Sequence, residues 1–104
     1  MDKIRDNTIK QYLDLIKSQY SDIDSAWLFG SYVKGTSTDD SDIDLALIFK
    51  NLKDSDRFDT QVKLMILASE IDSRIEPHPF SLDDFQFGNP FASEIMKTGI
   101  RIPA

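Results

Sequence analysis

The segment from residue 42 to residue 49 constrains the fold more than any other part of this sequence. Every second residue in it is large and apolar: Ile43, Leu45, Leu47 and Phe49. Successive side chains of a β-strand point to opposite faces of a sheet, so a period of two predicts a strand. One face of this strand is apolar throughout, whereas the other face begins with two acids, Asp42 and Asp44.

Two longer segments repeat apolar residues with the 3.6-residue period of an amphipathic helix. The first runs from about residue 6 to residue 20, and the second from about residue 58 to residue 71. The second segment has one apolar stripe that ends in a serine: Phe58, Val62, Met65, Ile66 and Ser69. Leu64 and Leu67 widen this stripe. We therefore expect the second helix to be well buried.

Shorter segments predict the remaining elements. Residues 25–29 are an apolar run closed by a glycine, which is typical of a buried strand that ends in a turn. Residues 74–76 predict a short strand that stops at Pro77, because proline cannot donate to a strand ladder. A capping Asn-Pro and a closing glycine predict a third helix over residues 90–98, and residues 100–102 suit an edge strand.

Length and composition limit the class of protein. A chain of 104 residues, 40% hydrophobic and 29% charged, is expected to form a single domain over residues 1–104. The order helix, strand, strand, helix, strand, helix predicts an α/β (α+β) fold in which a small mixed sheet is backed by helices. The sequence has no cysteine, which excludes disulfides and thiolate metal sites.

The charge and the apolar runs bear on partners and location. The net charge of −6 repels a phosphate backbone, so extended nucleic-acid binding by this chain alone is not expected. The longest apolar runs are too short to span a bilayer, and the charged start leads into no signal-type apolar segment. We expect a soluble, cytoplasmic protein with no membrane partner.

The acid pair follows a Gly-Ser step after a polar loop of ten residues. Asp42 and Asp44 place two like charges side by side, and Mg²⁺ bound by carboxylates and substrate phosphates is the common counter-ion. A two-ion site can stabilise both the attacking and the leaving oxygen of a phosphoryl displacement. Gly30 permits a tight turn, and Ser31 with the following N–H groups could hold a phosphate. The two halves together predict a nucleoside triphosphate site.

The acid pair alone is weak evidence, because fifteen of the eighteen acids are aspartate. Residues 21–24 repeat residues 41–44 letter for letter, yet no Gly-Ser step precedes them. We interpret the pair Asp22 and Asp24 as solvated. The combination of strand, Gly-Ser step, polar loop and acid-bearing strand carries the prediction.

Residues 28–35 (LFGSYVKG) and 41–45 (SDIDL) resemble the signature of the minimal nucleotidyltransferases, the smallest members of the DNA polymerase beta superfamily. These proteins are often antitoxins paired with helical HEPN ribonuclease toxins. The resemblance covers nearly the whole chain, because residues 75–80 and 89–100 are similar to the tail of such proteins. It implies the minimal nucleotidyltransferase fold.

The resemblance also implies residue roles at the metal site. Asp42 and Asp44 would bind the metal, and an acid on the next strand would complete a carboxylate triad. Glu76 matches that position, but Asp72 competes if the strand starts early, because alternate residues share one face.

At the phosphate site, Gly30 and Ser31 would bind the triphosphate. Many relatives carry arginine directly after the serine, whereas this chain has Tyr32, so phosphate contact is expected to fall to Lys34. His78, between two prolines, is interpreted as a rim or packing residue, and Arg74 as a counter-charge to the acids. Four phenylalanines near the C-terminus either pack the last helix or form an apolar surface for a partner: Phe80, Phe85, Phe87 and Phe91.

By resemblance the chain is a Mg²⁺-dependent nucleotidyltransferase that moves a nucleoside monophosphate, AMP from ATP, to a hydroxyl group. Larger relatives have an extra helical domain that binds the acceptor, and this chain has no residues left to build one. We therefore expect a protein acceptor, a HEPN-type toxin modified on a tyrosine. The alternative is a non-catalytic antitoxin or adaptor that neutralises its partner by binding.

Overall fold

The computed structural model describes residues 3–36 and 41–103, so part of the expected polar loop, residues 37–40, lies outside the described residues. The elements in chain order are α1 (Lys3–Gln19), β1 (Ile23–Phe29), α2 (Ser31–Lys34), β2 (Ile43–Phe49), η1 (Asp54–Asp56), α3 (Arg57–Ile71), β3 (Ile75–Ser81), α4 (Pro90–Thr98) and β4 (Ile100–Ile102). The expected order of helices and strands is confirmed. No helix in the described part of the chain is long and apolar enough to cross a membrane.

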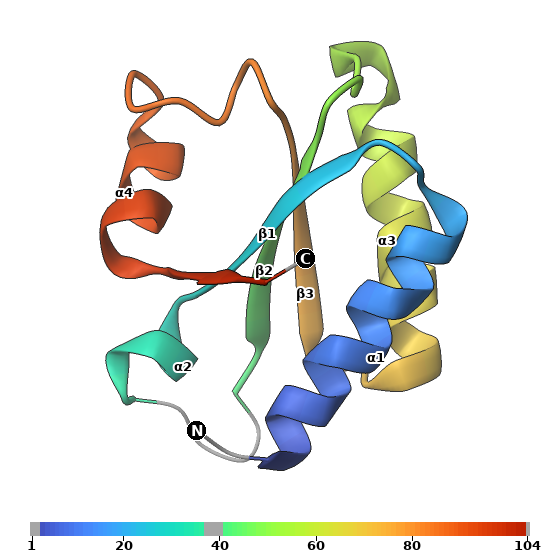
Figure 1. Cartoon of the computed structure of the whole chain (residues 1–104), viewed down its shortest axis with the longest axis vertical. Coiled ribbons are helices and arrows are strands. Elements are labelled where there is room, and N and C mark those ends of the chain that lie inside the picture. The colour runs from blue at the N-terminus through green and yellow to red at the C-terminus, as the bar shows by residue number, and fades with distance from the viewer. Residues whose placement is uncertain (1–2, 37–40, 104) are drawn as a thin grey trace.

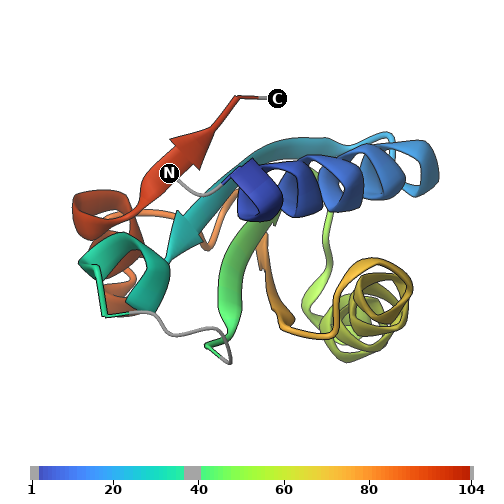
Figure 2. The same cartoon turned by 90° about the horizontal axis from the view of Figure 1, so that it is seen from below.

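The four strands form one mixed sheet in the order β3-β2-β1-β4 (Figure 1). β1 runs antiparallel to both β2 and β4, whereas β2 and β3 are parallel. Figure 2 separates α1 and α3 on one side of the sheet from α4 on the other. The predicted fold class, a small mixed sheet backed by helices, is confirmed.

The face of the sheet that packs on α1 and α3 contains the larger apolar core. Alternate residues of β2 supply its centre, as the period of two predicts: Ile43, Leu45, Leu47 and Phe49. Tyr12 of α1 is fully buried there, and its hydroxyl donates to the carbonyl oxygen of Leu64 in α3 at 2.9 Å. Burial raises the pKa of Tyr12 above its usual range, because a buried phenolate would lose its hydration.

The opposite face of the sheet packs on α4 and forms a second, smaller core. Its buried members come from β2, from β3 and the segment after it, and from α4: Ala46, Ile48, Phe80, Phe85, Ala92 and Ile95. The side chain of Asn89 caps α4 by accepting from the N–H groups of Phe91 and Ala92. The packing interpretation is thus confirmed for Phe80 and Phe85.

Strand β3 corrects one expectation. It was expected to stop at Pro77, but it continues through Pro77 and Pro79 to Ser81. Within the described part of the chain, β3 is paired on one side only. The two prolines occupy alternate positions whose backbone groups point to the unpaired side. Accordingly, the carbonyl oxygen of Pro77 accepts from the side chain of Gln61 in α3 at 2.6 Å. An edge strand tolerates proline at such positions because no ladder hydrogen bond is lost.

Helix α3 corrects a second expectation. Its buried residues are Leu64 and Ala68, whereas the stripe that was expected to be covered is largely exposed. The exposed apolar residues of this helix are Phe58, Val62, Met65 and Ile66. An apolar stripe of helical period therefore located the helix correctly but not the face that packs on the sheet.

Candidate functional site

The Gly-Ser step forms a sharp turn between β1 and α2. Gly30 adopts φ 81° and ψ −149°, a conformation that side-chain-bearing residues rarely adopt. Its carbonyl oxygen accepts from the N–H groups of Val33 and Lys34, both at 3.1 Å, which starts the short helix. A single helical turn follows the glycine, with Ser31 at its first position and exposed Lys34 at its last.

Asp44 packs directly against this turn. It pairs with Phe29, the last residue of β1, in the antiparallel register of β1 and β2. A Cβ atom placed on Gly30 would lie 2.4 Å from Oδ2 of Asp44, closer than real Cβ contacts allow. Only glycine therefore lets the turn and the carboxylate approach so closely.

The register of β2 and β3 brings a second carboxylate beside Asp44. Asp44 is the partner of Glu76 in the parallel pair, and both residues are half-buried. The N–H of Ile43 donates to the carbonyl oxygen of Arg74 at 2.8 Å, which fixes this register at the strand starts. Asp42 lies just before β2 and is exposed.

His78 joins the same face, two residues after Glu76. Its Nε2 lies 3.2 Å from Oδ1 of Asp44. Its ring packs on those of Phe29 and Phe91, with centroid separations of 5.1 and 6.0 Å. The sequence interpretation found the packing but missed the contact with Asp44. The period of two in β3 was the available signal, and it was lost because the strand was expected to stop at Pro77.

Asp72 is engaged elsewhere. It lies at the C-terminal end of α3, outside β3, and pairs with Arg74, with Nη2 of Arg74 2.8 Å from Oδ2. The side-chain hydrogen bond from Arg74 lowers the pKa of Asp72 below its ordinary value, against the opposing effect of burial. Nη1 of Arg74 also lies 3.3 Å from the hydroxyl of Tyr32 in α2. Glu76, rather than Asp72, is the acid beside Asp44.

The structure thus brings Gly30, Asp44 and Glu76 together, with exposed Asp42 at the start of the same strand. Within residues 3–36 and 41–103, no three His, Cys, Asp or Glu side chains form a group that could hold a metal ion. Mg²⁺ is usually bound by one or two carboxylates and by substrate phosphates. The oxygen-only donor set of Asp44 and Glu76 fits an ion of that kind.

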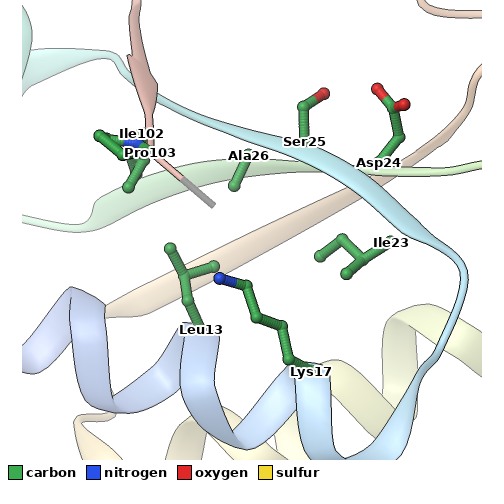
Figure 3. A pocket seen from close by; sticks show the side chains of 8 residues that line it. All are labelled: Leu13, Lys17, Ile23, Asp24, Ser25, Ala26, Ile102 and Pro103. Atoms are coloured by element: carbon green, nitrogen blue, oxygen red, sulfur yellow. The ribbon is translucent and has the colours of Figure 1, made fainter.

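Two cavities lie away from this region. One of about 270 Å³ lies between α1 and the strands β1 and β4, and Figure 3 shows Lys17 and Leu13 facing Ala26 and Ile102 across it. A neighbouring cavity of about 490 Å³ extends along α1 and β4. Neither is lined by Gly30, Asp44 or Glu76. Asp24, of the pair Asp22 and Asp24, lines the smaller cavity.

Solved structures share this fold. A candidate nucleotidyltransferase from Sulfolobus solfataricus matches with a TM-score of 0.66 and 21% identity, over 91% of this chain and 76% of the other. A toxin-antitoxin structure with AMP-PNP matches with a TM-score of 0.59 and 25% identity, over 91% and 69%. The complex of tri-AMPylated Shewanella oneidensis HEPN toxin with MNT antitoxin matches with a TM-score of 0.60 and 20% identity, over 92% and 69%.

Sequence comparison gives the family. A candidate protein adenylyltransferase of Methanocaldococcus jannaschii is 40% identical over 52 residues, which are 49% of this chain. The match spans only 35% of that relative. The family model described as polymerase beta, nucleotidyltransferase matches residues 7–103, so the resemblance carried by the Gly-Ser step and the acid pair is confirmed. The chain belongs to the polymerase beta nucleotidyltransferase family.

Proposed function

We propose that this chain transfers AMP from ATP to a hydroxyl group on a protein partner and releases pyrophosphate. The observation that carries the proposal is the placement of Asp44 between the Gly30 turn and Glu76. A turn that leaves no room for a Cβ atom, followed by a four-residue helix and flanked by two carboxylates, suits a substrate that carries phosphates and a divalent cation.

Each residue of the site has a role in this reaction. Ser31 and Lys34 would bind the leaving phosphates. Asp44 and Glu76, joined by Asp42 from the start of β2, would hold Mg²⁺ together with the substrate phosphates. When bound, Mg²⁺ draws negative charge away from the phosphate oxygens. The acceptor oxygen forms a bond to the α-phosphorus of ATP as the bond from that phosphorus to the pyrophosphate oxygen breaks. Glu76 takes the proton that leaves the acceptor hydroxyl.

The relatives support the choice of nucleotide and partner. One matched structure holds AMP-PNP, an ATP analogue, and another contains an AMPylated HEPN toxin with its antitoxin. The curated relative is named for protein adenylyltransfer, although the match spans about a third of it. A HEPN-type toxin is accordingly the proposed acceptor, and the chain would act as its antitoxin.

The test is transfer of label from α-³²P-ATP to the proposed HEPN-type acceptor protein, with Mg²⁺. We expect a labelled partner with the wild-type chain and none with Asp42→Asn plus Asp44→Asn. The matched control is Asp24→Asn, in the other copy of the same tetrapeptide, which should leave labelling intact. Equal labelling by Asp24→Asn and by the Asp42→Asn plus Asp44→Asn variant would overturn the assignment of the site.

A second candidate function is neutralisation by binding alone. The exposed apolar side chains of α3 favour it, because they suit a partner surface whether or not chemistry follows. The same variants decide between the two functions. If Asp42→Asn plus Asp44→Asn still silences the toxin in cells as well as wild type does, binding alone is sufficient.

A further inference from the structure

Helix α3 exposes a row of large apolar side chains on the side that faces away from the sheet. Among the described residues, Phe58 is 76% exposed, Ile66 58%, Met65 48% and Val62 39%. These four residues form the α3 stripe. Isolated exposed apolar residues are common in proteins, but a contiguous row of them marks an interaction surface.

The rotation of α3 is fixed, so the stripe cannot turn inward. Leu64 and Ala68 are buried in the core on the opposite side of the helix. Gln61 donates to the carbonyl oxygen of Pro77 at 2.6 Å and holds the helix against β3. The stripe therefore stays exposed unless another molecule covers it.

The spacing of the stripe indicates what shape would cover it. Its residues stand at i, i+4, i+7 and i+8, the pattern with which one helix presents a seam to another. A facing helix would place its own apolar side chains between these four.

The charges beside the stripe indicate the chemistry of that helix. Residues 54–71 carry four acids and two bases, and one of the bases, Arg57, already pairs with Asp54 and Asp84. Asp59 precedes Val62 by three positions and so borders the stripe. Asp59 also lines a hollow of about 380 Å³. The other charged residues that line it are Asp22, Asp56 and Lys63. Lysine or arginine side chains of a partner would fit there.

A second copy of this chain fits less well. Two copies would each bring a net charge of −6 and would place the same acids opposite one another. The C-terminal phenylalanines are a smaller alternative surface, because Phe80 and Phe85 are buried and only Phe87 and Phe91 are exposed.

We infer that the α3 stripe is the docking site for an amphipathic helix of a partner protein, with lysine or arginine beside its apolar seam. The inference rests on the proposed function in one respect, since it names the surface that would hold the protein acceptor. Asp44 lies on the sheet face opposite α3, as its alternation with Leu45 requires. A helix bound to the stripe therefore leaves Asp44 and the Gly30 turn uncovered.

The test uses three synthetic peptides of about 20 residues, long enough to form a helix, and measures binding to the full chain by fluorescence anisotropy. The first has an apolar seam flanked by lysines, the second has glutamates in place of the lysines, and the third is a scrambled version of the first. We expect the first to bind, and the other two to bind at least about tenfold more weakly. Equal binding of the first and third peptides would overturn the inference, because charge alone would then explain the affinity.

Two pairs of variants locate the site. Phe58→Gln plus Ile66→Gln should lose at least about tenfold in affinity for the first peptide. Val62→Gln plus Met65→Gln should lose affinity to the same extent. This second pair keeps the test valid if the first double variant does not fold. Phe87→Gln plus Ile100→Gln, equally exposed but outside α3, should bind as wild type does. Loss of binding only in this last pair would overturn the inference, and so would a wild-type dimer that the first pair converts to a monomer.

The shift in melting temperature on adding Mg²⁺-ATP separates this inference from the proposed function. A wild-type chain that binds the first peptide but shows no shift would retain the docking site and lose the enzyme assignment. A chain that shows the shift but does not bind the peptide would give the reverse conclusion.

Discussion

Asp44 and Gly30 lie so close together that a Cβ atom placed on Gly30 would be 2.4 Å from Oδ2 of Asp44. Asp44 has little freedom to move aside, because His78 lies 3.2 Å from its other oxygen and Glu76 is its neighbour on β3. The positions of the turn and of the carboxylate therefore depend on each other, and their close approach requires that residue 30 has no side chain.

Replacing Gly30 by alanine should damage both the fold and the site. The backbone strain at φ 81° and ψ −149° alone should lower the free energy of unfolding by about 1–3 kcal/mol. The added Cβ must also displace Asp44, so we expect AMP transfer to be lost. Urea unfolding measures the first effect and the labelling assay the second.

Gly35→Ala is the matched control. Gly35 also has a positive φ of 75°, but no atom of residues 3–36 or 41–103 lies within 4 Å of the position its Cβ would take. This variant should lose about 1 kcal/mol of stability and keep its activity. Similar losses of activity in both variants would show that the contact with Asp44 is unimportant.

Changing Asp42 and Asp44 together to asparagine should abolish stabilisation by Mg²⁺-ATP. A ligand that binds only the folded state at a hundredfold excess over Kd contributes about 2.7 kcal/mol. For a domain of this size that is a rise of roughly 10–20 °C in melting temperature, and weaker binding gives less. Differential scanning fluorimetry with and without Mg²⁺-ATP measures the rise, which the double variant should lack.

Asp22→Asn plus Asp24→Asn supplies the comparison for that melt. Oδ2 of Asp22 accepts from the N–H of Asn51 at 3.2 Å, and an asparagine side chain keeps an oxygen for this bond. This pair should keep the Mg²⁺-ATP shift. If both double variants respond alike, Asp42 and Asp44 are no more a metal site than Asp22 and Asp24.

The sequence predicted most of the fold because local patterns determine it. The period of two in β2, the asparagine cap of α4 and the glycine at the end of β1 each act within a few residues. The Gly-Ser step and the acid pair likewise predicted that Gly30 and Asp44 lie close together, because this proximity depends on two adjacent strands and one turn.

The parts that sequence could not predict depend on neighbours distant in the chain. Pro77 is acceptable in β3 only because the strand is at an edge, and strand order is not a local property. The contact of His78 with Asp44 depends on the same extension of β3. In α3, both Leu64 and Ile66 are apolar, and only the packing of the helix on the sheet decides which is buried.

Asp72 should make stability depend on pH in the acid range. Because Arg74 lowers its pKa in the folded state, the contribution of Asp72 is complete above its unfolded pKa of about 4 and declines as the pH falls through the folded value. At neutral pH, Asp72→Asn should cost about 1.5–3 kcal/mol, the value of a hydrogen bond to a charged group. Urea unfolding at neutral pH and below pH 4 should show the two proteins converging in acid. A constant difference at all pH values would contradict this account.

His78 makes two kinds of contact, and two substitutions separate them. His78→Phe keeps a ring against Phe29 and Phe91 but removes the donor to Asp44, whose ionised carboxylate can only accept. We expect stability within about 1 kcal/mol of wild type, but AMP transfer reduced about 10- to 100-fold, as when an outer partner of a metal ligand is lost.

His78→Asn keeps a polar side chain and loses the ring, so it should lose about 0.5–1.5 kcal/mol of stability and keep more activity than His78→Phe. Urea unfolding and the initial rate of labelling measure the two effects, and full activity in His78→Phe would limit the role of His78 to packing.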